Sequence, residues 1–158
     1  MILSPKIFLD QCIAYPIAVR LTNHYNPAYP SLKVRHLLDE YRAGRCDSVW
    51  LPNLAHEGGW IVVSKDRGKH PKAGGKPSLP ELCVEYRVTC VAFTGKLGNA
   101  KSAEHQEALD EVMRNIAPIY QAPNGTIIKL GMDYLKGGIK RYALRVRQRS
   151  LGIFLEPN

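Results

Sequence analysis

The stretch Trp60-Ile61-Val62-Val63-Ser64-Lys65-Asp66-Arg67 decides the fold of this chain. It follows Gly58-Gly59 as a short apolar run rich in β-branched residues, which is typical of a fully buried strand. The run ends abruptly in charged residues. In an open α/β sheet, ligands bind at the edge formed by the carboxyl ends of the strands. We therefore expect Lys65, Asp66 and Arg67 to lie at a functional edge.

The segments around this strand alternate between strand and helix patterns. The other expected strands cover residues 6–9, 32–38, 88–93 and 126–130. The expected helices begin near Ile13, Asp47, Leu79 and Ser102, and the last of them runs to Pro118. Such alternation indicates βαβ units. The sequence thus predicts a three-layer α/β sandwich whose mostly parallel central sheet has about four parallel strands.

The C-terminal part is expected to extend this domain. Residues 1–130 form the predicted domain, and residues 131–158 form a basic strand extension packed on it. After Gly137-Gly138, a strand places Tyr142, Leu144 and Val146 on one face and several arginines largely on the other.

Composition describes an ordinary globular chain of 158 residues with 45% hydrophobic and 23% charged residues. No apolar run approaches the roughly 20 residues that span a bilayer, and no secretory signal precedes the first strand. The four cysteines lack zinc spacing and are interpreted as reduced thiols. We expect a cytoplasmic protein without membrane contact.

The net charge of +8 is unevenly distributed. Residues 129–149 contain seven basic residues and one acidic residue, which supplies +6 of the +8. A second basic cluster surrounds Asp66 and consists of Lys65, Arg67, Lys69, Lys72 and Lys76. Such patches fit a polyanion, most simply nucleic acid. A solvated surface in a basic protein is an equally good interpretation of the charge alone.

Several carboxylates are expected to meet at the carboxyl edge of the sheet. Asp10 follows the first strand, Asp39 and Glu40 follow the second, and Asp66 follows the third. A crossover helix begins at the same edge, which adds Asp47. Thr94 and Lys96 follow the next strand to the same rim.

Each acid also has a structural interpretation. Asp10 and Asp47 are both suited to cap the helices that follow them. Asp39 and Glu40 fit ordinary loop acids, and Asp66 fits a surface ion pair. His36 is interpreted as a half-buried strand residue rather than a ligand. Only the shared edge makes a joint metal site about as plausible as these separate roles.

Clustered carboxylates repel one another unless a cation neutralises them. Mg²⁺ or Mn²⁺ is the usual cation, held by carboxylate and water oxygens. Such ions lower the pKa of a bound water and stabilise in-line displacement at phosphorus. Lys65, Arg67 and Lys96 are the expected phosphate-binding residues. An acidic centre with a basic rim therefore points to metal-dependent cleavage of nucleic acid.

Three segments resemble motifs of the PIN-like nucleases. They are Phe8-Leu9-Asp10-Gln11-Cys12, then His36-Leu37-Leu38-Asp39 with Asp47-Ser48-Val49-Trp50-Leu51, and Gly59 to Asp66. Leu82 to Phe93 and Thr94-Gly95-Lys96-Leu97 continue the pattern, so the resemblance covers about residues 7–120. Within the family, the chain is most similar to the VapC-like toxins of bacterial type II toxin–antitoxin systems.

The resemblance implies an Mg²⁺- or Mn²⁺-dependent endoribonuclease, a hydrolase, that is restrained by a cognate antitoxin protein. It makes Asp10, Asp47 and Asp66 the catalytic metal ligands, with Asp39 as an additional ligand and Glu40 as a weaker alternative. RNA is the implied substrate, although the residues do not separate RNA from DNA. A homodimer is one alternative that the sequence leaves open.

The chain departs from the family pattern after the first aspartate. Many relatives have an acid and an amide there, where this chain has Gln11 and Cys12. The alternative interpretation is therefore a catalytically inactive PIN-like module that binds RNA or a protein through its basic C-terminal residues.

Overall fold

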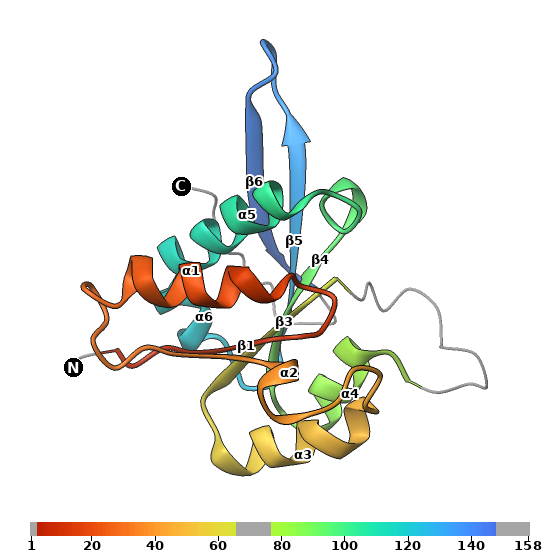
Figure 1. Cartoon of the computed structure of the whole chain (residues 1–158). Helices are drawn as coiled ribbons and strands as arrows, with labels where there is room; N and C mark the ends of the chain where they lie inside the picture. The colour runs from red at the N-terminus through yellow and green to blue at the C-terminus, as the bar shows by residue number, and fades with distance from the viewer. Residues whose placement is uncertain (1–2, 66–76, 148–158) are drawn as a thin grey trace.

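The structure is a computed structural model that describes residues 3–65 and 77–147. Its centre is a six-stranded sheet in the order β2-β1-β3-β4-β5-β6 (Figure 1). The strands are β1 (Lys6–Leu9), β2 (Lys33–His36), β3 (Trp60–Ser64), β4 (Thr89–Phe93), β5 (Ile127–Tyr134) and β6 (Lys140–Val146). The first five are parallel, and only β6 is antiparallel to its neighbour. The predicted mostly parallel sheet is confirmed, with five parallel strands instead of about four.

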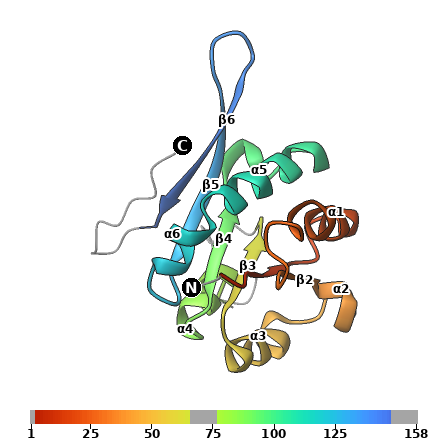
Figure 2. The ribbon, with the colours of Figure 1, turned by 90° about the vertical axis from the view of Figure 1, so that its left-hand side faces the viewer.

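Helices cover both faces of the sheet (Figure 2). One layer contains α1 (Tyr15–Tyr25), α5 (Ser102–Arg114) and α6 (Ile116–Gln121), and the other contains α3 (Asp47–Glu57) and α4 (Leu79–Glu85). This is the expected three-layer α/β sandwich. All five residues of β3 and of β4 are buried, which explains why β3 reads as an unbroken apolar run.

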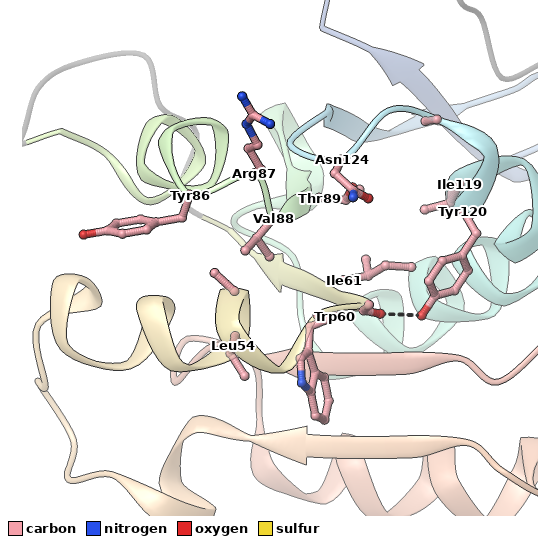
Figure 3. Close-up of a pocket in the computed structure, with 14 residues that line it drawn as sticks. Leu54, Trp60, Ile61, Tyr86, Arg87, Val88, Thr89, Ile119, Tyr120 and Asn124 are labelled. Atoms are coloured by element: carbon pink, nitrogen blue, oxygen red, sulfur yellow. Dashed lines mark hydrogen bonds between the residues drawn. The ribbon is translucent and has the colours of Figure 1, made fainter.

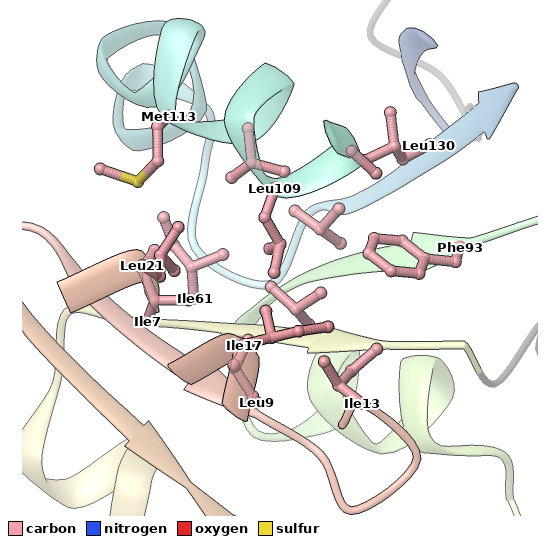
Figure 4. Packing of buried hydrophobic residues seen from close by; sticks show 14 of the residues in the cluster. Ile7, Leu9, Ile13, Ile17, Leu21, Ile61, Phe93, Leu109, Met113 and Leu130 are labelled. Carbon is pink, nitrogen blue, oxygen red and sulfur yellow. The ribbon is translucent and has the colours of Figure 1, made fainter. Parts of the chain in front are cut away.

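Each face of the sheet packs its own core. On the α1/α5 side, Ile7, Ile61 and Val91 contact the apolar stripe of α5, which includes Leu109 and Met113 (Figure 4). On the α3/α4 side, alternate strand residues pack with Trp50, Leu51, Leu54, Leu79 and Cys83. Neighbouring residues of one strand therefore face different layers, as the two-residue period of a strand requires.

The second predicted strand was drawn too long. Residues 32–38 alternate, but β2 ends at His36 and a one-turn helix, α2 (Leu37–Glu40), follows. A capping box explains the change of structure. The Asp39 carboxylate accepts a hydrogen bond from the His36 amide at 2.7 Å, and His36 Nδ1 accepts one from the Leu38 amide at 3.1 Å.

The helix expected to begin near Ser102 does begin there, with Lys101 at the N-cap position, but its expected end at Pro118 is wrong. The helix breaks at Asn115, whose side-chain amide donates to the Glu111 carbonyl oxygen at 2.8 Å. After the break, Pro118 lies in the first turn of α6, where the missing N–H of proline has no helical partner to lose. Helix α1 continues to Tyr25, although the turn-rich residues from Asn23 onward predict an end before Asn23.

The final two strands form a hairpin, here called the β5–β6 ribbon (residues 127–146), which projects from the body of the protein (Figures 1 and 2). Cys90 to Phe93 of β4 pair with Ile127 to Leu130 of β5, so the remaining residues of β5 continue beyond the carboxyl end of β4. The strands in the described part of the predicted extension, residues 131–147, therefore belong to the central sheet. Within the described residues, no helix is long and apolar enough to cross a membrane.

Candidate functional site

Asp10 lies at the carboxyl end of β1, next to the end of β3. Its amide donates to the Val63 carbonyl oxygen at 3.0 Å, so the parallel register of β1 and β3 continues to this residue. The Asp10 Oδ1 atom accepts from the Gln11 amide at 2.8 Å. The Oδ2 atom accepts from the Ser64 hydroxyl at 3.0 Å. The sequence correctly predicted that Asp10 and the end of β3 would meet.

Cys12 joins Asp10 and Ser64 in one polar group. Its thiol donates to Asp10 Oδ2 at 3.4 Å, and Cys12 Sγ lies 3.6 Å from Ser64 Oγ. Sγ also accepts from the Lys65 amide at 3.4 Å. Burial and the negative charge of Asp10 raise the pKa of Cys12 to about 11, so this residue is a neutral thiol at physiological pH.

Asp47 is the first residue of α3, and Cys46 rather than Asp47 occupies the N-cap. A carboxylate in the first turn still complements the helix dipole. A hydrogen bond with Cys90 and burial raise the pKa of Cys83, and the charges of Asp47 and Asp10 raise it further. The negative charges of Asp47 and Asp10 therefore both raise the pKa of the same buried thiol, Cys83, in the α3/α4 layer.

Asp39 has a local structural role in the described geometry. One carboxylate oxygen accepts from the His36 amide, and the other accepts a short hydrogen bond from the Tyr15 hydroxyl. Burial raises the pKa of Asp39, but these two hydrogen bonds together lower it by more than burial raises it. The pKa of Asp39 therefore lies below the ordinary carboxyl value. Glu40, the weaker alternative, pairs with Arg35 at 3.1 Å.

The predicted cations have different locations. Lys65 directly follows β3 and is exposed. Lys96 lies in the short helix η1 (Gly95–Leu97), and its Nζ atom is 5.7 Å from the centre of the Tyr134 ring. Asp66, Arg67, Lys69, Lys72 and Lys76 lie outside the described residues. Within residues 3–65 and 77–147, no group of three or more His, Cys, Asp or Glu residues is arranged to hold a metal ion.

Cys12, Ser64 and Tyr15 were not predicted as site residues. A sequence signal for Ser64 was present, because it is the last residue of the strand that carries the Ser-Lys-Asp motif. Side-chain alternation from Val62 places Ser64 on the same sheet face as Asp10. Cys12 and Tyr15 depend on the turn between β1 and α1, whose conformation the residue pattern does not specify.

A pocket of about 290 Å³ lies at the opposite edge of the sheet (Figure 3). It is bounded by the beginnings of β3 and β4 and by α6, and Arg87 is its one charged lining residue among those described. The Tyr120 hydroxyl closes one side by donating to the Gly59 carbonyl oxygen at 2.8 Å. This pocket is separate from Asp10, because the two lie at opposite ends of β3.

A comparison with family models adds a finding for the first part of the chain. A model described as a PIN like domain matches residues 5–70, a segment that contains all four candidate aspartates. The match covers less than half of the chain and supports a PIN-like domain in this part. Comparison with curated proteins and with solved structures gives no match.

Proposed function

We propose that this protein is a metal-dependent nuclease that cleaves RNA phosphodiester bonds. The observation that carries the proposal is the place of Asp10. It lies at the carboxyl edge of a parallel sheet, within hydrogen-bonding distance of Ser64, in a segment that matches a PIN-like family model. Nucleic acid is the substrate class that such a domain suggests.

The proposed metal ligands are Asp10, Asp47 and Asp66. Mg²⁺ prefers carboxylate oxygens and completes its shell with water and substrate oxygens, so aspartates are suitable donors for the ion even if one of the three acts through a bound water. When bound, the ion would supply a water of lowered pKa and stabilise charge at phosphorus. Asp66 enters the proposal from its sequence motif alone. Asp39 is the weakest of the candidate ligands, because the capping box with His36 and the hydrogen bond from Tyr15 already give its carboxylate a local structural role.

The surrounding side chains have distinct proposed roles. Ser64 and the Gln11 amide orient the Asp10 carboxylate by donating to separate oxygens. The neutral Cys12 thiol adds a third donor without adding charge. Lys65, Arg67 and Lys96 would bind substrate phosphates and offset the negative charge that develops during cleavage.

In this proposal the chain is the cytoplasmic toxin of a toxin–antitoxin pair, and a cognate antitoxin restrains it. The support is the sequence resemblance to VapC-like toxins. A homodimer is compatible with the proposal and is not required by it. Coexpression with the product of a small adjacent reading frame would test the pairing, since an antitoxin should relieve growth inhibition and copurify with the chain.

The decisive experiment is cleavage of a labelled mixed-sequence RNA with Mg²⁺ or Mn²⁺, repeated with excess chelator. We expect cutting by the wild type that chelator abolishes and that is lost in Asp10→Asn and Asp66→Asn. Glu85→Gln is the matched control, because it likewise turns a carboxylate into an amide, at an exposed position at the far end of α4. Metal-dependent cleavage by Asp66→Asn at the wild-type rate would refute the assignment of Asp66, whereas cleavage that persists in chelator would come from a contaminating ribonuclease.

A second readout does not depend on activity. Binding of Mn²⁺ alone, measured by calorimetry, should be present in the wild type and in Glu85→Gln and should weaken at least tenfold in Asp10→Asn. Loss of one direct or neighbouring oxygen ligand typically changes metal affinity by about 10- to 100-fold. Equal Mn²⁺ affinity in all three proteins would exclude Asp10 as a ligand.

One observation favours a second candidate function, a catalytically inactive PIN-like binding module. Protein donors already satisfy both oxygens of Asp10, and one of these donors is Cys12, where many relatives have an amide. In that case RNA would bind without being cut in any metal, and Mn²⁺ affinity would be unchanged by Asp10→Asn. The two experiments above separate this module from the nuclease.

A further inference from the structure

The β5–β6 ribbon has two unlike faces. Residues Ile128, Leu130, Met132, Tyr142 and Leu144 are buried in the core on the α1/α5 side. Because side chains alternate along a strand, the residues between them point to the opposite side. We call this the open face of the ribbon, and it consists of Lys129, Gly131, Asp133, Arg141, Ala143, Arg145 and Arg147. Each of these residues is exposed or half-buried.

The open face carries an unfavourable charge arrangement. Lys129 and Arg145 are direct cross-strand partners, and like charges in this position destabilise a sheet. Among the described residues, Lys129, Arg145 and Arg147 have no ion-pair partner, whereas Arg141 lies 3.7 Å from Asp133. Four cations and one acid leave a net charge of +3 on one side of a two-stranded ribbon. Among the described residues, neither packing nor ion pairs offset the repulsion between these positive charges.

Small residues separate the cations. Gly131 and Ala143 are cross-strand partners that lie between the Lys129–Arg145 pair and the Asp133–Arg141 pair. Gly131 has no side chain and Ala143 has only a methyl group, so a ligand can approach this half-exposed part of the ribbon between the long basic side chains, although the Thr94 hydroxyl lies beside Gly131. Lys and Arg are the side chains that bind phosphate, and the guanidinium group does so with two parallel hydrogen bonds.

The open face lies on the same side of the sheet as the candidate cleavage site. In the register of the sheet, Ser64 pairs with Ala92, Ala92 with Lys129, and Lys129 with Arg145. Lys129 is thus two strands from Ser64, or about 10 Å. Ala92 lies between Ser64 and Lys129 and is buried. The candidate cleavage site and the open face are therefore neighbours on one side of the sheet, but they do not form one open groove.

We propose that the open face of the β5–β6 ribbon binds the sugar–phosphate backbone of single-stranded nucleic acid, at a place separate from the carboxylates. The major groove of an RNA duplex is too deep and narrow to admit such a ribbon, so a single strand is the form of RNA that suits the open face. This surface lies outside residues 5–70, the part that matches the family model. That the bound strand is the substrate rests on the proposed function, while the binding surface itself does not.

The test is fluorescence anisotropy with a labelled single-stranded RNA of mixed sequence, in excess chelator, over a range of salt. The variant K129Q/R145Q removes both members of the cross-strand pair. The matched control K33Q/R87Q also removes two exposed positive charges, but at the amino edge of the sheet. The conservative variant K129R/R145K keeps both charges and serves as the rescue.

We expect K129Q/R145Q to bind about tenfold more weakly and to lose roughly 0.7 per lost phosphate contact from the slope of log affinity against log salt. The control and the rescue variant should keep the wild-type affinity and slope within twofold. An equal loss in the ribbon variant and the control would overturn the proposal. So would a wild type that binds no RNA at low salt, which would point to an acidic protein as the occupant of this face.

The outcome can be separated from the proposed function. Chelator prevents metal-dependent cleavage, so RNA binding is measured in the absence of cutting, and Glu85→Gln, far from both sets of residues, should bind as tightly as the wild type. If cleavage fails in every metal but K129Q/R145Q still loses affinity selectively, the ribbon surface stands and the nuclease proposal falls.

Discussion

At the scale of single residues, the polar group around Asp10 makes a prediction about Cys12. The charge of Asp10 is the largest cause after burial for the raised pKa of the thiol. Asp10→Asn removes that charge, so the Cys12 pKa should fall below its value of about 11. Iodoacetamide alkylation, followed against pH by mass spectrometry of the Cys12 peptide, measures this change. Glu85→Gln should leave the profile unchanged, and an unaltered profile in Asp10→Asn would contradict the geometry.

Asp39 makes a prediction about the pH dependence of stability. Its pKa in the folded protein is lowered, chiefly by the hydrogen bond from Tyr15, although burial opposes this. The stabilisation is therefore present above the ordinary carboxyl pKa of about 3.9 and is lost as pH falls through the folded value. Because Asp39 is exposed and screened, the effect should be under about 1 kcal/mol.

Tyr15→Phe should raise the Asp39 pKa and reduce this acid-dependent loss. NMR titration of the carboxyl group gives the pKa, and urea unfolding at pH 7 and at acid pH gives the stability. Val19→Ala, an exposed change on the same helix, is the control. A Tyr15→Phe variant with an unchanged Asp39 pKa would show that the hydrogen bond has no effect in solution.

Residue-scale prediction from sequence succeeded where strand ends decide the position. Asp10 lies at the expected edge because β1 ends at Leu9, the residue before it. Asp39 could be placed after β2, but its bond to the His36 amide depends on a capping box that forms only once residues 37–40 turn into a helix. The metal-ligand roles of Asp10, Asp39, Asp47 and Asp66 stay predictions.

At the scale of elements, the turn between α6 and β5 requires glycine. Gly125 has a φ of +86°, and a Cβ atom there would lie 3.1 Å from the Cα atom of Arg87. Gly137, in the turn of the ribbon, has a φ of +84° but no heavy atom within 4 Å of such a Cβ. Gly137→Ala should therefore cost about 1 kcal/mol for its backbone strain.

Gly125→Ala carries the same strain plus the backbone contact, so its total cost should be roughly 2–4 kcal/mol. Both changes reduce the entropy of the unfolded chain equally, so the difference between them reports the contact with Arg87. Urea unfolding of the two variants measures it. Equal stabilities would mean that the turn shifts and relieves the contact.

Element boundaries were the least predictable part of the fold. The apolar spacing of residues 109–120 fits one continuous helix. In the structure a helix ends before Asn115 and α6 starts after it, so that Pro118 lies in the first turn of α6 and not in a helix interior. Helix propensity alone cannot distinguish a helix that ends at Pro118 from a new helix that has Pro118 in its first turn. The strands were easier, because β3 and β4 are buried on both faces and read as continuous apolar runs.

At the scale of the whole molecule, two separate cores share one sheet. Trp50 and Trp60 both lie in the core on the α3/α4 side, whereas Leu109 lies in the core on the α1/α5 side. Leu109→Ala should cost roughly 2–5 kcal/mol. If the sheet couples the layers, tryptophan fluorescence and far-UV circular dichroism will shift together to a lower denaturant midpoint.

The exposed Val84 on α4 provides the control, since Val84→Ala should leave both probes nearly unchanged. A fluorescence transition that stays at the wild-type midpoint, while the dichroism transition moves, would show that the layers unfold separately. The alternation of strands and helices was enough to predict the layered architecture. The projecting ribbon was foreseen only as an extension, because its register with β4 depends on long-range pairing.

The place of β6 as an outer strand of the described sheet has a consequence for aggregation. An outer strand offers its backbone N–H and C=O groups to any other chain that can pair with it, and basic side chains discourage such pairing. Arg141, Arg145 and Arg147 lie on one face along β6 and its end, with Ala143 between the first two. The residues that we propose to hold nucleic acid therefore also keep copies of the protein apart. Variants that neutralise these arginines should bind nucleic acid more weakly, and they should also aggregate more readily during expression.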